Sequence, residues 1–346
     1  MTSGDRFTAE RASDERFTVV IPTRNRPLGV MAMLRYLRVD LGWTCPVVVV
    51  DQSDDGGTAL ARALQDGDVA GVQHLRQRER GTGVARNAGA RLVRTAWLLL
   101  LDDDVRPARG YLEAIGAHID ANPWLDAVQP GLEQRAPWEE YQRDPAAWLA
   151  KRATMPPERI APTPAWDGVR WFTNSPRTGF GALTVGVASG NLAISRRAFV
   201  GVGGFDEQIQ GRGDDSEFGV RLWWYGYRVC ILPQPVAFHL REPHGGTRGA
   251  VSRWERLLAP EPPVGWVYFH LKWFPGTPLA DMRREYLRGA LRRPWTLPVR
   301  LLRFRKSLSI ARARLASGPR YLSKPQPRDA GEAARYESRQ VAEVAP

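Results

Sequence analysis

Cysteine and long apolar runs are scarce in this sequence, and each scarcity excludes a class of protein. The 346 residues include two cysteines, Cys45 and Cys230. Two thiols so far apart cannot form a disulfide framework or a cysteine metal motif, so we expect a reducing compartment. No stretch approaches the roughly 18 consecutive apolar residues of a membrane-spanning helix. Residues 1–16 are polar and charged, unlike a signal peptide, and predict a disordered leader on a cytoplasmic protein.

Positive charge is abundant but unevenly distributed. The formal net charge is +12, yet without residues 281–346 the chain is close to neutral. Between Arg288 and Arg328 there are twelve Lys or Arg and no Asp or Glu. Such a block favours an anionic surface, either membrane or nucleic acid. From residue 297 onward apolar residues recur among the arginines at helical spacing, which predicts a basic amphipathic helix; they are Leu301, Phe304, Leu308, Ala311 and Leu315.

Short buried-strand patterns alternate with helical patterns in the first third of the chain. The candidate strands are residues 17–22, 47–50, 97–101, 229–232 and 236–239, with a further short candidate over 71–75 and a regular pattern over 185–194. Alternating strands and helices predict an α/β domain whose central sheet is mostly parallel and flanked by helices. Ligands bind such sheets beyond the carboxyl ends of the strands. The first three candidate strands each end in polar residues, so we expect the site there.

Two acidic groups are the candidates for chemistry. Asp102, Asp103 and Asp104 follow a predicted strand, and alternate residues of an extended segment share a face. Asp102 and Asp104 are therefore placed to hold a divalent cation, Mg²⁺ or Mn²⁺, against a diphosphate. Asp214 and Asp215 open a predicted helix, where a carboxylate is placed to act as a general base. A solvated turn and a helix cap are the structural alternatives, but the position after a buried strand and the density of acids favour chemistry.

The order of the motifs resembles family 2 of the glycosyltransferases, an inverting family with the GT-A fold. The likeness covers roughly residues 17–240, and although each motif is weak alone, their shared order is specific. The sequence departs from the family pattern at Gln52, where a second acid is commoner, and at Asp214, where glutamate is usual. The segments that carry the resemblance are Val19–Pro27, Asp51–Asp54, Gly83–Gly89, Leu101–Asp104, Ser189–Arg197, Gly203–Asp206 and Asp214–Arg228.

The resemblance implies a role for most of these residues. Asp215 matches the catalytic base, which would take the proton of the acceptor hydroxyl, and Asp214 lies beside it. The implied metal ligands are Asp104, Asp102 and His239. The implied nucleotide-sugar contacts are Pro22, Thr23, Arg24, Asp51, Arg86, Asp102 and Asp103. The implied acceptor contacts are Gly190, Asn191 and Trp223.

The prediction is therefore a GT-A glycosyltransferase with a basic helical C-terminal extension. It would move a hexosyl or deoxyhexosyl group from a nucleotide-diphosphate sugar to a hydroxyl of a glycan, a lipid-linked acceptor or a small molecule. The loop over residues 162–181 is expected to shape the substrate pocket. The predicted organisation is a leader over 1–16, a glycosyltransferase domain over 17–240 with a nucleotide-sugar-binding half (17–105) and an acceptor half (106–240), the extension over 241–324, and a disordered tail over 325–346.

Other functions stay open at this point. A nucleotidyltransferase acting on sugar phosphates shares the donor-side sheet, but residues 23–27 lack its glycine-rich loop. A non-catalytic protein that binds an anionic surface is a second alternative. Nucleic acid is not expected as a partner, because aromatic residues are not interleaved with the basic ones. For the extension, peripheral attachment to the anionic cytoplasmic face of a membrane competes with a solvated basic face that packs on the catalytic domain.

Overall fold

The computed structural model describes most of the predicted glycosyltransferase domain and three helical pieces of the extension. The predicted substrate loop (162–181) and tail (325–346) lie outside the described part, as does most of the leader. The described residues are 15–67, 69–154, 182–183, 187–209, 213–242, 264–273, 279–288 and 294–317.

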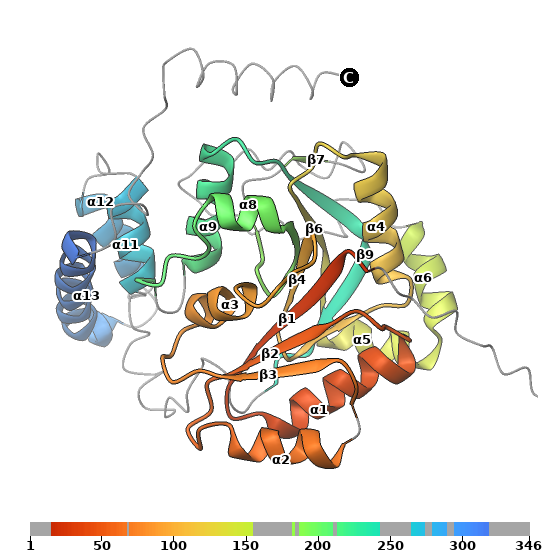
Figure 1. The fold of residues 1–346 in the computed structure, drawn as a ribbon. Helices are drawn as coiled ribbons and strands as arrows, with labels where there is room; N and C mark the ends of the chain where they lie inside the picture. The colour runs from red at the N-terminus through yellow and green to blue at the C-terminus, as the bar shows by residue number, and fades with distance from the viewer. Residues whose placement is uncertain are drawn as a thin grey trace, which may run out of the picture.

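One mixed sheet runs through the centre of the molecule (Figure 1). Its order is β3-β2-β1-β4-β8-β6-β9-β5, and β7 pairs with β9. The parallel half consists of β1 (Phe17–Thr23), β2 (Val47–Asp51), β3 (Val72–Arg76) and β4 (Trp97–Leu101). The remaining strands are β5 (Val105–Pro107), β6 (Ala127–Gln134), β7 (Ala182–Leu183), β8 (Asn191–Ser195) and β9 (Val229–His239). The two strands expected over 229–239 are thus one strand, opposite a register shift in β6.

The parallel strands are buried on both faces, which is why they read as unbroken apolar runs. Successive side chains point to opposite faces. In β1, Val19 belongs to the apolar cluster that includes side chains of α1 (Pro27–Arg35), α2 (Thr58–Asp66) and α4 (Tyr111–Ala121). Val20 belongs to a different cluster, which includes side chains of α8 (Arg196–Gly201) and α9 (Asp214–Trp224). The sheet is therefore the middle layer between two helical layers.

Helix α3 (Thr82–Ala90) approaches the sheet unusually closely. A Cβ atom at Gly89 would lie 2.5 Å from Cγ1 of Val20 and 3.0 Å from Cγ2 of Val50. Glycine at this position therefore lets the helix backbone lie directly on β1 and β2. The close approach brings the first turn of α3 to the edge where the parallel strands end.

The C-terminal helices form a separate cluster beside α9 (Figure 1). Phe304 and Ala311, two residues of the predicted amphipathic stripe, are buried against Trp266 and Tyr268 and so belong to the core of this cluster. Among the described residues, no helix combines the length and apolar character needed to cross a lipid bilayer. The elements are α11 (Val264–Trp273), α12 (Leu279–Arg288), the 3-10 turn η3 (Pro294–Thr296) and α13 (Leu297–Ser317).

Two further helices and both cysteines complete the description. Helices α5 (Arg135–Arg143) and α6 (Pro145–Ala153) pack Trp138, Tyr141 and Trp148 around Phe238 of β9. A π-helical turn, η1 (Tyr36–Asp40), extends α1. Cys45 and Cys230 are buried free thiols.

Candidate active site

The carboxyl ends of β1 and β4 are joined by side-chain hydrogen bonds. Thr23, the last residue of β1, donates its hydroxyl to Oδ2 of Asp103 at 2.7 Å. The main chain of Asp102 donates to the carbonyl of Gly190 at 3.0 Å, which brings the segment before β8 to the same place. The three aspartates after β4 therefore lie where the sequence predicts the ligand site.

Arg86 of α3 links the two acidic groups that the sequence singled out. Its side chain is 4% exposed. One guanidinium nitrogen donates to Oδ1 of Asp102 at 2.8 Å, and the other lies 3.5 Å from Oδ2 of Asp214. The hydroxyl of Thr82 also donates to Asp214, at 2.9 Å. Acids that are more than a hundred residues apart in sequence therefore share one buried cation.

Asp215 is held on the other side by Ser189. The main-chain N–H of Ser189 donates to Oδ1 of Asp215 at 3.1 Å, and its hydroxyl donates to the same oxygen. Burial and the charge of Asp214 raise the pKa of Asp215, Arg86 and the hydrogen bonds from Ser189 oppose the rise, and the resulting pKa is about 7. Burial likewise raises the pKa of Asp214, against the attraction of Arg86. A carboxyl group that titrates near neutral pH is suited to general-base work.

Asp104 lies at the opposite edge of the site, beside the end of β9. Its Oδ1 is 3.3 Å from Nε2 of His239, and its Oδ2 accepts from the main-chain N–H of Glu242 at 3.2 Å. Burial tends to raise the pKa of Asp104, but the hydrogen bond and charge of His239, together with Arg26, outweigh it and lower the pKa. Asp104 is therefore ionised at neutral pH.

Arg26 is a site residue that the sequence reasoning missed. It donates to Oδ1 of Asp103 at 2.5 Å, to Oδ2 of Asp104 at 3.2 Å and to the carbonyl of Glu242 at 3.0 Å. Burial raises the pKa of Asp103 to about 6, although Arg26 and Thr23 oppose the rise. Arg24, the residue that the resemblance implied instead, pairs at 3.1 Å with Asp54, a half-exposed residue outside this cluster.

The predicted metal ligands are brought together in part. Asp104 and His239 are adjacent, whereas Asp102 is held by Arg86. Within the described part of the chain, no group of three His, Cys, Asp or Glu side chains is arranged to hold a metal ion. The carboxylate and imidazole pair fits two positions around a divalent cation that takes its other ligands from phosphate and water oxygens.

Asp51 and Gln52, at the end of β2, form hydrogen bonds with nearby loop and strand residues. Asp51 accepts from the main-chain N–H of Ser53 at 2.8 Å, and its other oxygen is 3.3 Å from Nε2 of His74. Gln52, the departure from the family pattern, donates its amide to the carbonyls of Glu79 at 2.5 Å and Gly81 at 3.1 Å. Gln52 thus fastens the loop that leads into α3. Pro22 is buried within β1, where it lies in register with Val50.

The three acceptor candidates occupy different surroundings. Gly190 lies against the carboxylate of Asp102, so it belongs to the cluster. Asn191 is fully buried. Its side-chain oxygen accepts a hydrogen bond from the hydroxyl of Tyr111, and its side-chain nitrogen donates to the carbonyls of Pro130 and Gly131. Its placement supports a structural role in joining β8 to β6. Trp223 packs at the far end of α9 among other aromatic residues, away from Asp215.

A buried ion-pair network lies directly behind the acids of α9. Lys272 of α11 places Nζ 2.8 Å from Oδ2 of Asp206 and 2.8 Å from Oε1 of Glu217. Glu217 also binds Arg221, one turn further along α9, at 2.5 Å. The network fastens the extension to the helix that begins with Asp214 and Asp215. In the sequence, Glu217 looks like one more acid in the first turn of a helix.

The fold defined by this sheet and site is the GT-A glycosyltransferase fold. It is similar to that of S. aureus TarS 1-349 in complex with UDP-GlcNAc, with a TM-score of 0.50 and 15% identity over 73% of this chain and 64% of that one. Residues 18–175 match the model of glycosyl transferase family 2. The resemblance noted from the motifs is therefore confirmed.

Two curated relatives have sequences similar to this one. A pre-mycofactocin glycosyltransferase of Mycobacterium tuberculosis is 29% identical over 229 residues, which are 64% of this chain and 42% of the relative. A validoxylamine A glucosyltransferase of Streptomyces hygroscopicus is 27% identical over 264 residues, which are 67% of this chain and 57% of the relative. The chain spans about half the length of these relatives.

Proposed function

We propose that this chain transfers a sugar from a nucleotide-diphosphate sugar to an acceptor hydroxyl, with inversion at the anomeric carbon. The observation that carries the proposal is the connection of Asp215 and Asp214 through Arg86 to Asp102 at the end of β4. This connection sets a base with a pKa near 7 beside the edge of the sheet where such folds bind nucleotides. The two relatives, named as glycosyltransferases, support the same activity.

In this mechanism Asp215 takes the proton of the acceptor hydroxyl while the oxygen attacks the anomeric carbon. The bond from that carbon to the diphosphate breaks on the opposite side. Ser189 holds the Asp215 carboxylate in place by its two hydrogen bonds. Arg86 is positioned for the departing diphosphate, since a guanidinium binds phosphate oxygens strongly. A Mg²⁺ or Mn²⁺ ion bound at Asp104 and His239 would neutralise charge on the leaving group.

Nucleotide contacts remain a proposal centred on Asp51 and Arg86. Thr23 acts through Asp103, which it orients by its hydrogen bond. The proposed transferred group is hexosyl or deoxyhexosyl, in keeping with the glucosyltransferase named among the relatives. The proposed acceptor is a hydroxyl on a glycan, a lipid-linked molecule or a small molecule.

The base is tested by the substitution Asp215→Asn. A thermal-shift panel of UDP, GDP and dTDP sugars with Mn²⁺ first identifies the donor, because a ligand of the native state raises its stability. With that donor, Asp215→Asn should lower transfer by on the order of 10²–10⁴-fold while donor binding persists. The matched control is Asp66→Asn, at the exposed end of α2.

The product also distinguishes this activity from nucleotidyl transfer. Sugar transfer releases a nucleoside diphosphate, whereas a nucleotidyltransferase acting on a sugar phosphate releases inorganic diphosphate. Wild-type transfer by the Asp215→Asn protein would disprove the base, and release of inorganic diphosphate would disprove the proposed reaction.

A further inference from the structure

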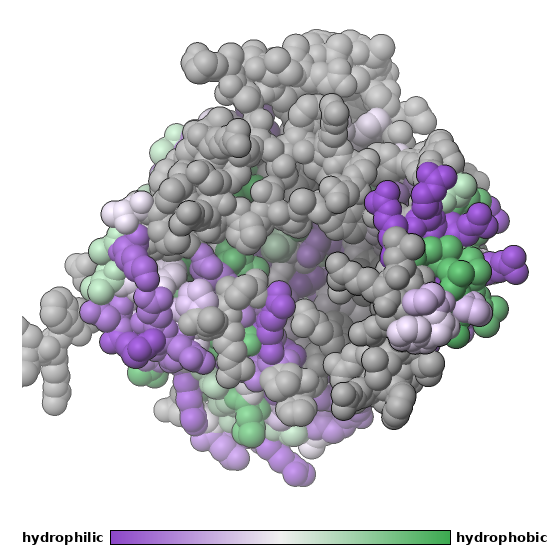
Figure 2. Space-filling model, turned by 180° about the vertical axis from the view of Figure 1, so that it is seen from behind, coloured by the Kyte–Doolittle hydropathy of each residue, from purple (hydrophilic) through white to green (hydrophobic). Residues whose placement is uncertain are grey.

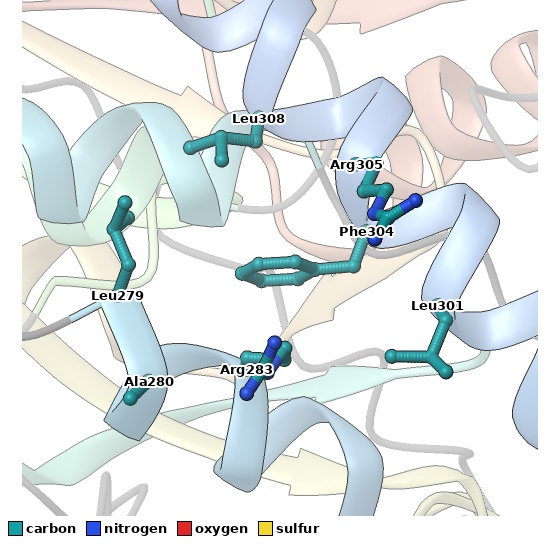
Figure 3. Close-up of a pocket in the computed structure, with 7 residues that line it drawn as sticks. All are labelled: Leu279, Ala280, Arg283, Leu301, Phe304, Arg305 and Leu308. Carbon is teal, nitrogen blue, oxygen red and sulfur yellow. The ribbon is translucent and has the colours of Figure 1, made fainter.

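Helices α12 and α13 leave a groove of about 280 Å³ between them. Figure 3 shows the ring of Phe304 reaching from α13 into the space between the helices, with Leu301 and Leu308 on either side of it along α13. The groove has apolar walls and one arginine from each helix. Its lining residues are Leu279, Ala280, Arg283, Leu301, Phe304, Arg305 and Leu308.

The charges of the groove all have one sign. Arg283 and Arg305 are exposed, and none of the seven lining residues is acidic. In the sequence, α13 contains no Asp or Glu at all. An apolar trench flanked by guanidinium groups matches a molecule with a hydrocarbon chain and an anionic head.

Large apolar side chains are also exposed on η3 and α13, close in sequence to the residues that line the groove, and we call them its rim. Trp295 of η3 is 72% exposed, Leu302 of α13 is 69% exposed, and Leu297 at the start of α13 is 40% exposed. Scattered exposed apolar residues are ordinary, but these three fall within eight positions of the chain, and Leu279, which lines the groove, is 36% exposed as well. Figure 2 shows apolar surface next to strongly hydrophilic side chains at the edge where α12 and α13 lie.

We propose that this groove and its rim bind anionic phospholipid at a membrane surface. The lipid phosphate lies between Arg283 and Arg305, the adjoining part of an acyl chain covers Phe304, and Trp295 and Leu302 enter the interface. Tryptophan favours this position because its ring is apolar at one end and polar at the other. The stripe residue Ala311, by contrast, is buried in the helical cluster and makes no contact with lipid.

A nucleic acid fits this surface less well. Single-stranded nucleic acid is bound by aromatic side chains on which successive bases stack, in grooves that follow the phosphates. Here the one exposed aromatic residue among the described parts of α12, η3 and α13 is Trp295, and the groove contains one aromatic ring, that of the buried Phe304, among aliphatic side chains. The apolar walls therefore favour lipid over a polymer of phosphates.

The test measures co-flotation of the full chain with vesicles of phosphatidylcholine, with and without phosphatidylglycerol. We expect binding to the anionic vesicles alone. The double variant Arg283→Gln/Arg305→Gln should bind them about 30-fold more weakly, because each surface arginine contributes roughly fivefold. The matched control removes the same charge from exposed positions of α1 and α2, as Arg35→Gln/Arg62→Gln, and should bind like the wild type.

A second variant tests the apolar part of the surface. Trp295→Gln/Leu302→Gln changes two exposed side chains, so the fold should persist, and it should weaken binding while leaving the preference for anionic vesicles unchanged. Equal losses in the groove variant and the control would overturn the proposal, as would an absence of wild-type binding to anionic vesicles. Tighter binding to an oligonucleotide that survives the groove substitution would overturn it too. Nucleotide-sugar binding should be the same in all variants, so the outcome is independent of the proposed sugar transfer.

Discussion

Lys272 offers the sharpest test of how the extension supports the site. Its ammonium group is 4% exposed, and the carboxylates of Asp206 and Glu217 that it contacts are fully buried. Arg221 is equally buried and pairs with Glu217. The network thus contains two acids and two cations, so it is neutral as a whole.

The substitution Lys272→Met keeps the size of the side chain and removes its charge. Glu217 keeps Arg221, but Asp206 loses the ammonium group and keeps the hydroxyl of Tyr268 and the main-chain N–H of Gln208, which are both uncharged donors. Removing one partner of a buried pair costs about 3–5 kcal/mol, because the other charge stays buried and uncompensated. We expect the free energy of unfolding to fall by that amount.

The measurement is urea denaturation of four proteins: the wild type, Lys272→Met, Asp206→Asn and the double variant. In the double variant Glu217 and Arg221 still balance each other, so it should recover part of the loss, with a coupling in the range of roughly 0.5–3 kcal/mol. Lys151→Met, in the exposed pair with Glu140, is the control and should cost less than about 1 kcal/mol. A loss in Lys272→Met as small as in this control, or strictly additive losses, would refute the reasoning.

Three further outcomes are expected. The pKa of Asp215 is raised from 3.8 to about 7 in the folded protein, so the folded state holds this proton more tightly than the unfolded chain. The stability of the unliganded protein should therefore fall as pH rises from 3.8 to about 7 and level off above that, and Asp215→Asn should flatten the slope, as a pH titration of unfolding would show. Transfer should increase as Asp215 loses its proton near pH 7, as a pH titration of the rate would show. Asp104→Asn should abolish the Mn²⁺ dependence of the thermal shift that the donor causes, and a chelator should have the same effect on the wild type. A thermal shift that neither the substitution nor the chelator changes would contradict the metal assignment. Gly89→Ala should destabilise the protein by about 1–3 kcal/mol, because its new methyl group would collide with Val20. Gly29→Ala should be tolerated, because a Cβ there would lie 3.7 Å from Cβ of Arg26, and thermal unfolding compares the two variants.

The central strands of the sheet could be predicted from the sequence because they are buried on both faces and therefore form unbroken apolar runs. The predicted runs at 17–22, 47–50 and 97–101 correspond to β1, β2 and β4 within one residue. The position of the acids that follow these strands could also be predicted, because parallel strands end at the same edge of a sheet.

The sequence did not show whether Arg24 or Arg26 contacts the aspartates of the site. The backbone of Asn25 adopts the left-handed region, with φ of 56°, and so turns the loop between the two arginines. As a result Arg24 faces Asp54 and Arg26 faces Asp103. A sequence shows two arginines in one loop, but the turn between them decides which one enters the site.

Ion pairs between residues far apart in the sequence could not be predicted either. Lys272 sits in an aromatic run, and its partners lie 55 and 66 positions away, so no local pattern connects them. The apolar stripe of α13 was recognised, but its partner was not. Phe304 and Ala311 belong to the apolar cluster that α13 forms with α11 and α12, whereas Leu297 and Leu302 are exposed. Helical spacing predicts that a face is apolar, and tertiary packing decides what covers it.

The charge balance of the site argues for a bound cation during sugar transfer. Asp102, Asp103, Asp104, Asp214 and Asp215 are gathered around Arg26 and Arg86, so carboxyl groups outnumber guanidinium groups. A diphosphate that approaches this edge adds negative charge where negative charge already predominates. Protonation relieves Asp215 near neutral pH, but Asp215 must lose that proton to act as a base. Negative charge remains at Asp104, because the pKa of this carboxyl group is lowered. His239 beside it offers a second metal ligand. A divalent cation bound by this pair would offset the repulsion between the diphosphate of the donor and the carboxylates of the site.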